Sequence, residues 1–141
     1  MIWVIAANAI ACRIFLYSRS PTRLTMIGEI HHPENRLKKQ DFLSAGGREM
    51  LVPRTDPKDV ELNNFARDIG HDIMHGRKTH AFEKIIFLTT PHMLGLISRH
   101  VDKSTRSMVL NTIKKDPQHF SGSQIMDILV ENTRYPDVSK F

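Results

Sequence analysis

The sequence has a single cysteine, Cys12, and no long apolar run, and both shortages exclude classes of protein. One cysteine cannot form an internal disulfide or a zinc or iron-sulfur site of several cysteines. No stretch approaches the ~20 apolar residues of a transmembrane helix. A signal peptide carries basic residues ahead of its apolar run, and the apolar N-terminus has none at that place. These features predict a cytoplasmic protein without a membrane span.

The chain also lacks the short motifs that mark common cofactor and metal sites. Its 7 glycines are too scattered for a dinucleotide-binding or P-loop motif, and neither a GxSxG nor an HExxH sequence occurs. His71 and His75 have the four-residue spacing of two metal ligands on a helix, but both point away from the apolar stripe of the helix predicted there. We interpret them as solvated surface residues, and we expect no metal and no cofactor.

The excess of positive over negative charge is small and is spread along the chain. The formal charge is +5, with 8 Lys or Arg against 5 acids in residues 1–56 and 12 against 10 in residues 57–141. This balance favours an anionic partner such as RNA, a phosphorylated ligand or an acidic surface. The chain has no block of like charges of the kind that a dedicated nucleic-acid arm carries.

The first 30 residues read as three strands in a meander. Residues 2–6 are apolar, residues 11–17 alternate between two faces, and residues 24–30 resume an extended apolar pattern. Asn8 lies between the first two runs, where a tight turn needs it. Short connections of this kind predict antiparallel pairing.

The rest of the chain alternates helix and strand. A 3.6-residue period predicts a helix that begins at Pro57 and stops at Gly76, and residues 85–88 read as a strand buried on both faces. Thr90 and Pro91 predict the start of a second helix, residues 108–113 a fifth strand, and Ser121 to Gln124 the capping box of a last helix. The core positions that this pattern predicts are Leu62, Phe65, Ala66, Ile69, Ile73, Leu94, Ile97, Val101, Ile125, Ile128 and Leu129.

These elements predict a single α/β domain over residues 1–131, followed by a surface tail over residues 132–141. The segment from 82 to 113 is a βαβ unit, which must be parallel and right-handed. Its first strand is expected beside the N-terminal strand, giving a five-stranded mixed sheet of order 3-2-1-4-5 with helices on its faces, the ribonuclease-H-like arrangement. Nucleases of this fold need carboxylates on the first and fourth strands to hold two metal ions. Neither strand contains an acid here, which disfavours that activity.

The segment before the first helix concentrates glycine, proline and charge. Asp56, Pro57 and Asp59 are explained as a helix start, because they satisfy or complement its free N–H groups. Cations at the same place do nothing for the helix, but beside free N–H groups they suit a phosphate or a carboxylate. The sequence therefore predicts an anion-binding loop, as an alternative to simple solvated charge, at Gly46, Gly47, Arg48, Arg54 and Lys58.

Candidates for catalysis are few. Asp116 and His119 follow the fifth strand and have the residue types of an acid and base pair, although a turn held by Asp116 and Pro117 explains them as well. Cys12 alternates with Ile14 and is interpreted as a buried structural thiol. His31 and His32 end the third strand, and at most one of them can face the core.

Several motifs together resemble the bacterial host-attachment protein family. The hairpin "WVIAANAIACRIF" is similar to the "WVVVADGARARIF"-like opening of its members, and four further motifs occur in the same order: "HHPENRL", "PRTDPKDVELNNFARDI", "IIFLTTPHMLGLI" and "KKDPQHFS". The resemblance covers the chain to about residue 130. It implies a role in bacterial attachment to a host cell, and it implies no particular reaction.

The family is also distantly similar to the central domain of archaeal and eukaryotic class-1 translation release factors. That domain has the same sheet order and carries a Gly-Gly-Gln loop before a long helix, whose glutamine promotes peptidyl-tRNA hydrolysis. Gly46 and Gly47 occupy a comparable place here, but the next residue is Arg48. The resemblance therefore implies the location of a ribosome or tRNA contact rather than peptide release.

Three hypotheses follow from the sequence. The first is a non-catalytic binding module that contacts RNA, tRNA or a ribosomal partner through the 46–58 loop. The second is a host-attachment or stress-related protein that acts through protein contacts. The third is a hydrolase that uses Asp116 and His119 on a phosphorylated or ester substrate. The number of copies in the functional protein is left open.

Overall fold

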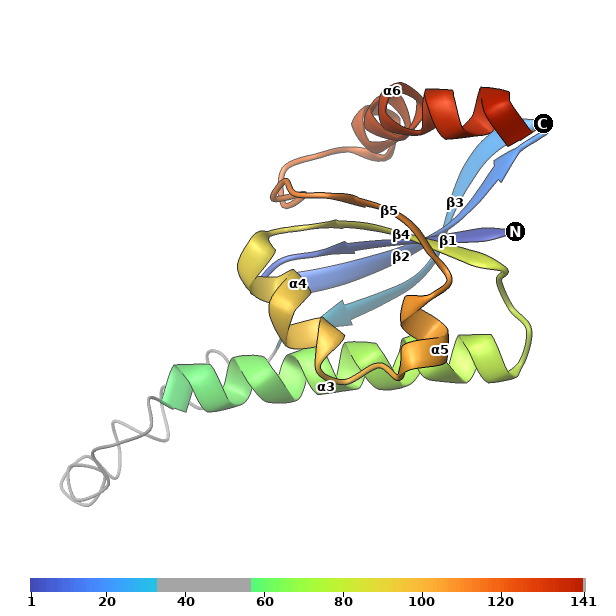
Figure 1. The fold of residues 1–141 in the computed structure, drawn as a ribbon. Helices are drawn as coiled ribbons and strands as arrows, with labels where there is room; N and C mark the ends of the chain where they lie inside the picture. The colour runs from blue at the N-terminus through green and yellow to red at the C-terminus, as the bar shows by residue number, and fades with distance from the viewer. Residues whose placement is uncertain (33–56, 141) are drawn as a thin grey trace, which may run out of the picture.

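The fold is a single sheet with helices on both faces (Figure 1). The computed structural model describes the backbone of residues 1–32 and 57–140 and the side chains of residues 1–32 and 60–132. In chain order the elements are β1 (Ile2–Ala7), β2 (Ala11–Arg19), β3 (Thr22–His31), α3 (Pro57–Lys78), β4 (Lys84–Thr89), α4 (Pro91–Ser98), α5 (Lys103–Arg106), β5 (Val109–Ile113) and α6 (Gly122–Lys140).

The strand order is β3-β2-β1-β4-β5, which confirms the predicted mixed sheet and fits the ribonuclease-H-like arrangement. β1 pairs antiparallel with β2 and β2 antiparallel with β3, as the short connections predict. β4 lies parallel to β1 on its other side and to β5, so the βαβ prediction is also confirmed. β1 is thus the strand at which a local meander meets the crossover half of the chain.

The turn after β1 is built on Asn8, as predicted. Its backbone N–H donates to the carbonyl oxygen of Ala11 at 3.0 Å. Its side-chain Oδ1 accepts the N–H groups of Ile10 at 2.8 Å and Ala11 at 3.0 Å. An asparagine side chain replaces a turn of backbone in this way, which is why this residue type closes the hairpin.

The helices divide between the two faces of the sheet. In Figure 1, α3, α4 and α5 lie below the strands and α6 lies above them. Ile5 and Ile85 pack toward α3 in one buried cluster, while Val4 and Ile86 pack toward α6 in the other. Successive strand residues face opposite sides. Residues Ile85 to Leu88 are all buried, which confirms the prediction of a strand covered on both faces.

The predicted helix starts are confirmed by their caps. Thr90 Oγ1 accepts the N–H of Met93 at 3.3 Å, with Pro91 in the first turn of α4. At the start of α6, Ser121 and Gln124 form the two reciprocal hydrogen bonds of a capping box. The N–H of Ser121 donates to Gln124 Oε1 at 2.8 Å, and the N–H of Gln124 donates to Ser121 Oγ at 3.2 Å. The predicted core positions are buried except for Leu62, Leu94 and Ile128, which are half-buried.

Helix α6 continues to Lys140, through residues expected to form a surface tail. The side chains of residues 133–140 are outside the described part of the structure, so the division of the chain at residue 131 stays a prediction.

The predicted stop at Gly76 is wrong. α3 continues to Lys78, and the left-handed residue that follows it is His80, with φ 60°. Gly76 has another purpose, because a Cβ atom there would lie 2.5 Å from Cη2 of Trp3 and 3.0 Å from Cε2 of Phe82. The rings of Trp3 and Phe82 pack with centroids 4.7 Å apart, so the helix needs a glycine where they pass.

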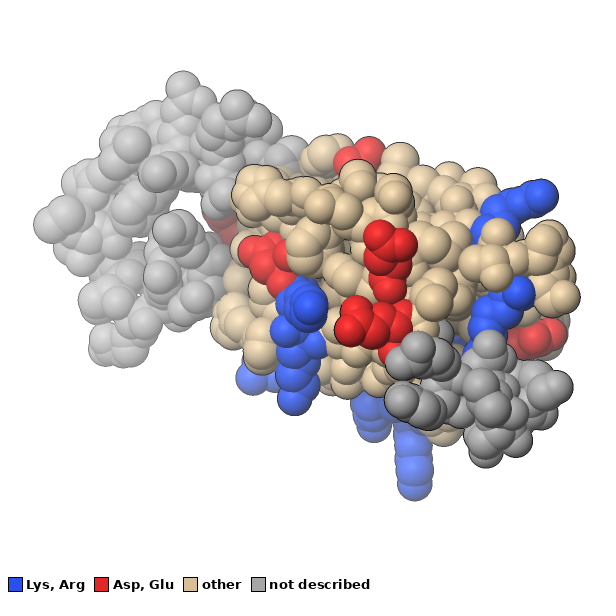
Figure 2. Space-filling model, turned by 90° about the horizontal axis from the view of Figure 1, so that it is seen from above, with Lys and Arg blue, Asp and Glu red and all other residues tan. Residues whose placement is uncertain are grey.

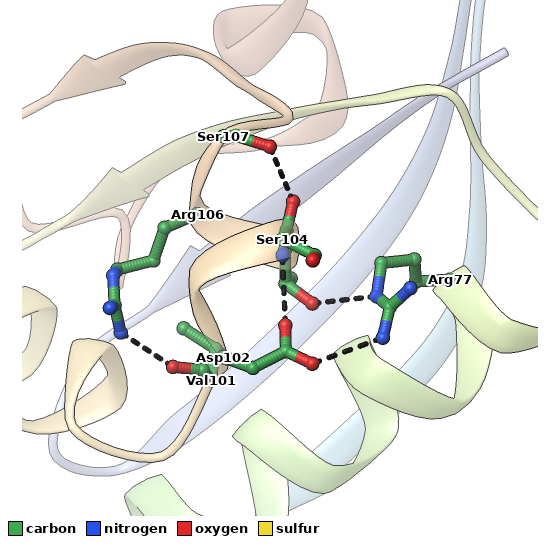
Figure 3. Close-up of polar contacts among 7 residues, drawn as sticks. Arg77, Val101, Asp102, Ser104, Arg106 and Ser107 are labelled. Atoms are coloured by element: carbon green, nitrogen blue, oxygen red, sulfur yellow. Dashed lines mark hydrogen bonds and ion pairs between the residues drawn. The ribbon is translucent and has the colours of Figure 1, made fainter.

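Helix α5 was not predicted, and polar contacts rather than apolar periodicity hold it. Asp102 caps it, accepting the N–H of Thr105 at 2.8 Å. Figure 3 shows Arg77 reaching from α3 to Asp102, with a nitrogen-oxygen distance of 3.0 Å. Hydrogen bonds from Thr105, and then the charge of Arg77, lower the pKa of Asp102. A four-residue helix shows no period, which is why the sequence pattern misses it.

Replacement of Gly76 tests the close approach of α3 to the sheet. Gly76→Ala improves helix propensity by about 1 kcal/mol, but the overpacking against two rings costs about 1–3 kcal/mol. We expect a net loss of about 1 kcal/mol in the free energy of unfolding, measured by urea denaturation. Gly95→Ala in α4 is the matched control, since its Cβ meets nothing within 4 Å and propensity alone then stabilises. Equal stabilisation by both changes would contradict the packing account.

Candidate functional site

The candidate site is the edge of the sheet where the parallel strands end. β1 and β4 run parallel, and β3 shares their direction because both β3 and β1 are antiparallel to β2. The Asn8 turn, the start of α4, the 114–121 loop and His32 therefore lie at one edge, which is at the left in Figure 1. Ligands of open α/β sheets bind outside the carboxyl ends of the strands. This carboxyl edge is thus where the fold itself favours a site.

The predicted anion loop falls largely outside the described residues. Gly46, Gly47, Arg48 and Arg54 belong to the undescribed segment, and so does the predicted cap Asp56. Lys58 lies in the first turn of α3, which begins at Pro57 as predicted, although its side chain is not described. The structure therefore fixes the helix start beside the loop and leaves the loop itself as a prediction.

The residue that precedes this segment, His32, is held firmly. Its N–H donates to the carbonyl oxygen of Ile10 at 2.9 Å, and its ring Nδ1 donates to that of Ala9 at 3.0 Å. The ring stacks on Phe65 of α3, with centroids 4.8 Å apart and an interplanar angle of 6°. Its side chain is buried while His31 is exposed, which confirms that only one of the two faces the core. The stack ties the end of β3 to the first half of α3.

Arg13 fastens the 114–121 loop to the hairpin. Its guanidinium donates to the carbonyl oxygens of Pro117 at 2.6 Å and Phe120 at 3.0 Å. The same group lies 5.7 Å from the ring centroid of Phe15, within cation–π range. Asn8 adds a second tie, because its Nδ2 donates to Oδ1 of Asp116 at 2.9 Å. Residues far apart in sequence are thus joined at this edge by charge-assisted and amide hydrogen bonds.

The structure does not pair Asp116 with His119 by a hydrogen bond within its described part. Oδ1 of Asp116 accepts from Asn8 and from the N–H of Gln118 at 3.0 Å. His119 is exposed. This is the geometry of a turn held by an aspartate, which was the alternative explanation of the sequence. A catalytic role for the two residues stays an untested prediction.

A surface pocket of about 210 Å³ opens between the hairpin and this loop. Its walls include one cation, Arg13, and one anion, Glu29, together with small and apolar side chains. The lining residues are Ala6, Asn8, Ile10, Ala11, Arg13, Glu29, Pro117 and Gln118. The sequence did not predict this pocket, and none of its lining residues was among the predicted site residues.

The remaining candidates are structural or solvated. Cys12 is fully buried, and burial, followed by the charge of Asp72, raises its pKa to about 12, so the thiol stays protonated at neutral pH. His71 and His75 are exposed on α3. Within residues 1–32 and 60–132, no three His, Cys, Asp or Glu side chains gather as a metal site would require.

Among the described residues, positive charge does not form one continuous surface on the α6 side. Figure 2, which looks down on this side, shows Lys and Arg in separate groups with Asp and Glu between them. A long nucleic acid laid across α6 would meet both signs of charge. The described part of this face therefore does not outline a continuous surface for a polyanion.

The structure defines a single-domain α/β protein with a surface pocket at the ends of its parallel strands. The family model described as "Protein required for attachment to host cells" matches residues 3–129, so the chain belongs to that family. No curated protein matches the chain. Within the described residues, no helix is both long and apolar enough to cross a membrane.

Sequence reasoning missed Arg13, and the signal for it was visible. In residues 12–17 the pattern places Arg13 on the same face as Phe15 and Tyr17, both of which are buried. A long cation that shares a face with two buried aromatic residues needs polar partners. Its partners are carbonyl oxygens more than 100 residues away, and carbonyl groups leave no trace in a sequence.

Replacement of Asn8 tests the tie between the turn and the loop. Asn8→Asp keeps the acceptor for the turn but sets a carboxylate against Asp116, so we expect a loss of about 1–3 kcal/mol in the free energy of unfolding at neutral pH. The deficit should shrink near pH 4, where carboxyl groups gain protons. Asn8→Ala removes the amide without adding charge, and its deficit should not shrink in this way. Parallel pH profiles for the two variants would refute the contact.

The burial of Cys12 predicts a silent thiol. Because its pKa is raised to about 12, the reactive thiolate is nearly absent in the native protein at pH 8. A disulfide reagent such as 5,5′-dithiobis(2-nitrobenzoate) should label the unfolded chain at once and the native chain only as fast as it opens. Rapid labelling without denaturant would show that Cys12 is accessible.

Proposed function

We propose that this host-attachment family member is a non-catalytic binding module that contacts RNA, in tRNA or the ribosome, through the 46–58 loop. The observation that carries the proposal is the position of the residues flanking that segment. His32 stacks on Phe65, two turns into α3, at the carboxyl edge of the sheet, and α3 begins at Pro57. The described residues on either side of the predicted loop therefore lie near the edge at which this class of fold binds ligands, which supports the proposal.

The start of α3 supports an anionic partner. The first N–H groups of a helix have no partners within it, and its dipole favours negative charge there. Lys58 lies in this first turn, while Arg48 and Arg54 precede it in the sequence. The net charge of +5 adds a weak general attraction for a polyanion.

The resemblance to release factors that the sequence motifs suggest would favour the same location. There a loop of two glycines and a glutamine precedes the long helix, and here the sequence is Gly46, Gly47 and Arg48. An arginine binds phosphate and stacks on bases, but it does not replace a glutamine amide. The substitution favours contact with RNA over hydrolysis of peptidyl-tRNA, and a cytoplasmic setting is part of the proposal.

A protein partner is the second candidate, and one observation favours it. Within the described sheet, β3 pairs with β2 alone, so its outer edge has no strand beside it. Met26 and Ile27 on this strand are 50% and 48% exposed. An edge strand with exposed apolar side chains suits strand addition by another chain. Such an association would resist salt, unlike a phosphate contact.

The test is RNA binding at graded salt by the triple variant Arg48→Ala, Arg54→Ala and Lys58→Ala. A plot of log affinity against log salt concentration has a negative slope, and each lost phosphate contact reduces its steepness by about 0.7 to 0.9. Loss of three contacts therefore reduces the steepness by about 2. Fluorescence anisotropy with labelled tRNA and sedimentation with ribosomes measure it.

The matched control removes three charges at the opposite edge of the sheet. Lys78 ends α3, Lys84 begins β4 and Lys103 begins α5, and all three side chains are exposed. Their triple replacement by alanine should leave the salt slope nearly unchanged. Equal losses in both variants would mean general charge attraction without a site. Absence of RNA binding at low salt would exclude the proposed function.

A further inference from the structure

The pocket beside the Asn8 turn carries charges of both signs on one face of the sheet. Arg13 of β2 and Glu29 of β3 are directly opposite each other in the register. Directly opposed residues have Cβ atoms about 5 Å apart and side chains on the same face. No ion pair joins the two within the described residues, although both line the pocket. A ligand in the pocket would therefore meet a cation and an anion side by side.

Arg13 has donors left for a ligand. A guanidinium has five N–H groups, and the carbonyl oxygens of Pro117 and Phe120 take one each. These two bonds fix the plane of the group against the loop, so it need not be ordered again on binding. A held guanidinium with free N–H groups suits a carboxylate, which it can bind through two oxygens.

Glu29 supplies the opposite charge. Its Oε2 lies 3.2 Å from Nε2 of the exposed His31, and its side chain is 39% exposed at the pocket rim. A carboxylate at this place attracts an ammonium group and repels a phosphate. This combination selects against simple anions, which Arg13 alone would accept.

The rest of the pocket limits the size of the ligand. A volume of about 210 Å³ corresponds to about seven waters at ~30 Å³ each. The small side chains of Ala6 and Ala11 and the apolar side chain of Ile10 line it, while Gln118 adds an amide from the loop. A molecule of fewer than about ten non-hydrogen atoms, with a short aliphatic part, fits this space.

We propose that this pocket binds a small aliphatic α-amino acid, with its carboxylate on Arg13 and its ammonium group on Glu29. The pocket lining includes no residue of the 46–58 loop, and the proposal does not depend on RNA binding. The ligand would touch β2 and β3 on one side and Gln118 of the 114–121 loop on the other. Binding would therefore stabilise the position of this loop against the two strands. The chain would then sense the free amino acid at the carboxyl edge of its sheet.

The experiment titrates the full chain with L-alanine, L-valine and L-leucine, followed by calorimetry and by the amide NMR signals of Ala11, Glu29 and Gln118. N-acetyl-L-leucine lacks the ammonium group, L-leucinamide lacks the carboxylate, and inorganic phosphate tests a plain anion. We expect at least one of the three amino acids to bind and to shift these signals. The three comparison compounds should bind about tenfold more weakly or not at all, because each loses a charge-assisted bond.

Two variants probe the pocket without cutting the loop ties of Arg13. Glu29→Gln keeps the shape and should weaken binding about tenfold. Ala11→Val adds two methyl groups to the pocket wall in a strand that tolerates them, and should block the larger amino acids first. Asp127→Asn, on the exposed side of α6, removes the same charge elsewhere and should change nothing. Circular dichroism checks that each variant is folded.

Three results would overturn the assignment. One is the absence of any binding heat or NMR signal shift with all three amino acids at concentrations up to about 10 mM, which is well above the dissociation constant of a weak but useful ligand. Another is unchanged binding in both Glu29→Gln and Ala11→Val. The third is equal binding of N-acetyl-L-leucine or phosphate, which would show that the pocket is an anion site. None of these outcomes bears on RNA binding, which has its own test.

Discussion

β1 carries the fold, because it is the strand on which both halves of the chain depend. β1 pairs with β2, which follows it after a three-residue turn, and with β4, which begins at residue 84. Residues Val4 to Ala7 are buried and lie between α3 on one face and α6 on the other. Such a strand can hold only apolar side chains and must have its backbone paired on both edges. Polar chemistry is therefore displaced to its ends.

The two ends of β1 solve this constraint in different ways. At the start, Trp3 packs on Phe82 and passes close to Gly76, so contact there is apolar and tight. At the other end, Asn8 is buried and satisfies its amide through the turn and the 114–121 loop. Buried amides cost free energy unless every group is bonded, so they hold a loop in one place. The start of β1 is therefore held by apolar packing, and its end by the hydrogen bonds of Asn8.

The sequence predicted what apolar periodicity and turn chemistry control. The strand order, the burial of Ile85 to Leu88 and the starts of α4 and α6 all followed from local patterns. The stop at Gly76 failed because a glycine has two uses, a left-handed turn and a close approach, and the sequence does not distinguish them. The ring of Trp3, 73 residues earlier, decides between them.

The site was less predictable than the fold, for a physical reason. Lys58 and Pro57 could be placed because a helix start has a sequence signature. The pocket could not, because it forms where Arg13, Glu29 and the 117–118 turn come together from three segments. Its assembly depends on backbone carbonyl groups, which every residue has. Tertiary contacts of this kind appear only when the register of the strands is known.

The stack of His32 on Phe65 has a consequence for how this edge can change over evolution. It anchors the chain just before residue 33, close to the helix that begins at Pro57. Once the ends of a segment are held near each other by contacts outside it, doubling its length costs only about 0.6 kcal/mol in closure entropy. Insertions and deletions between these anchors would leave the sheet and its core untouched. A lineage can therefore vary the length of the segment between these anchors at little cost to the stability of the scaffold.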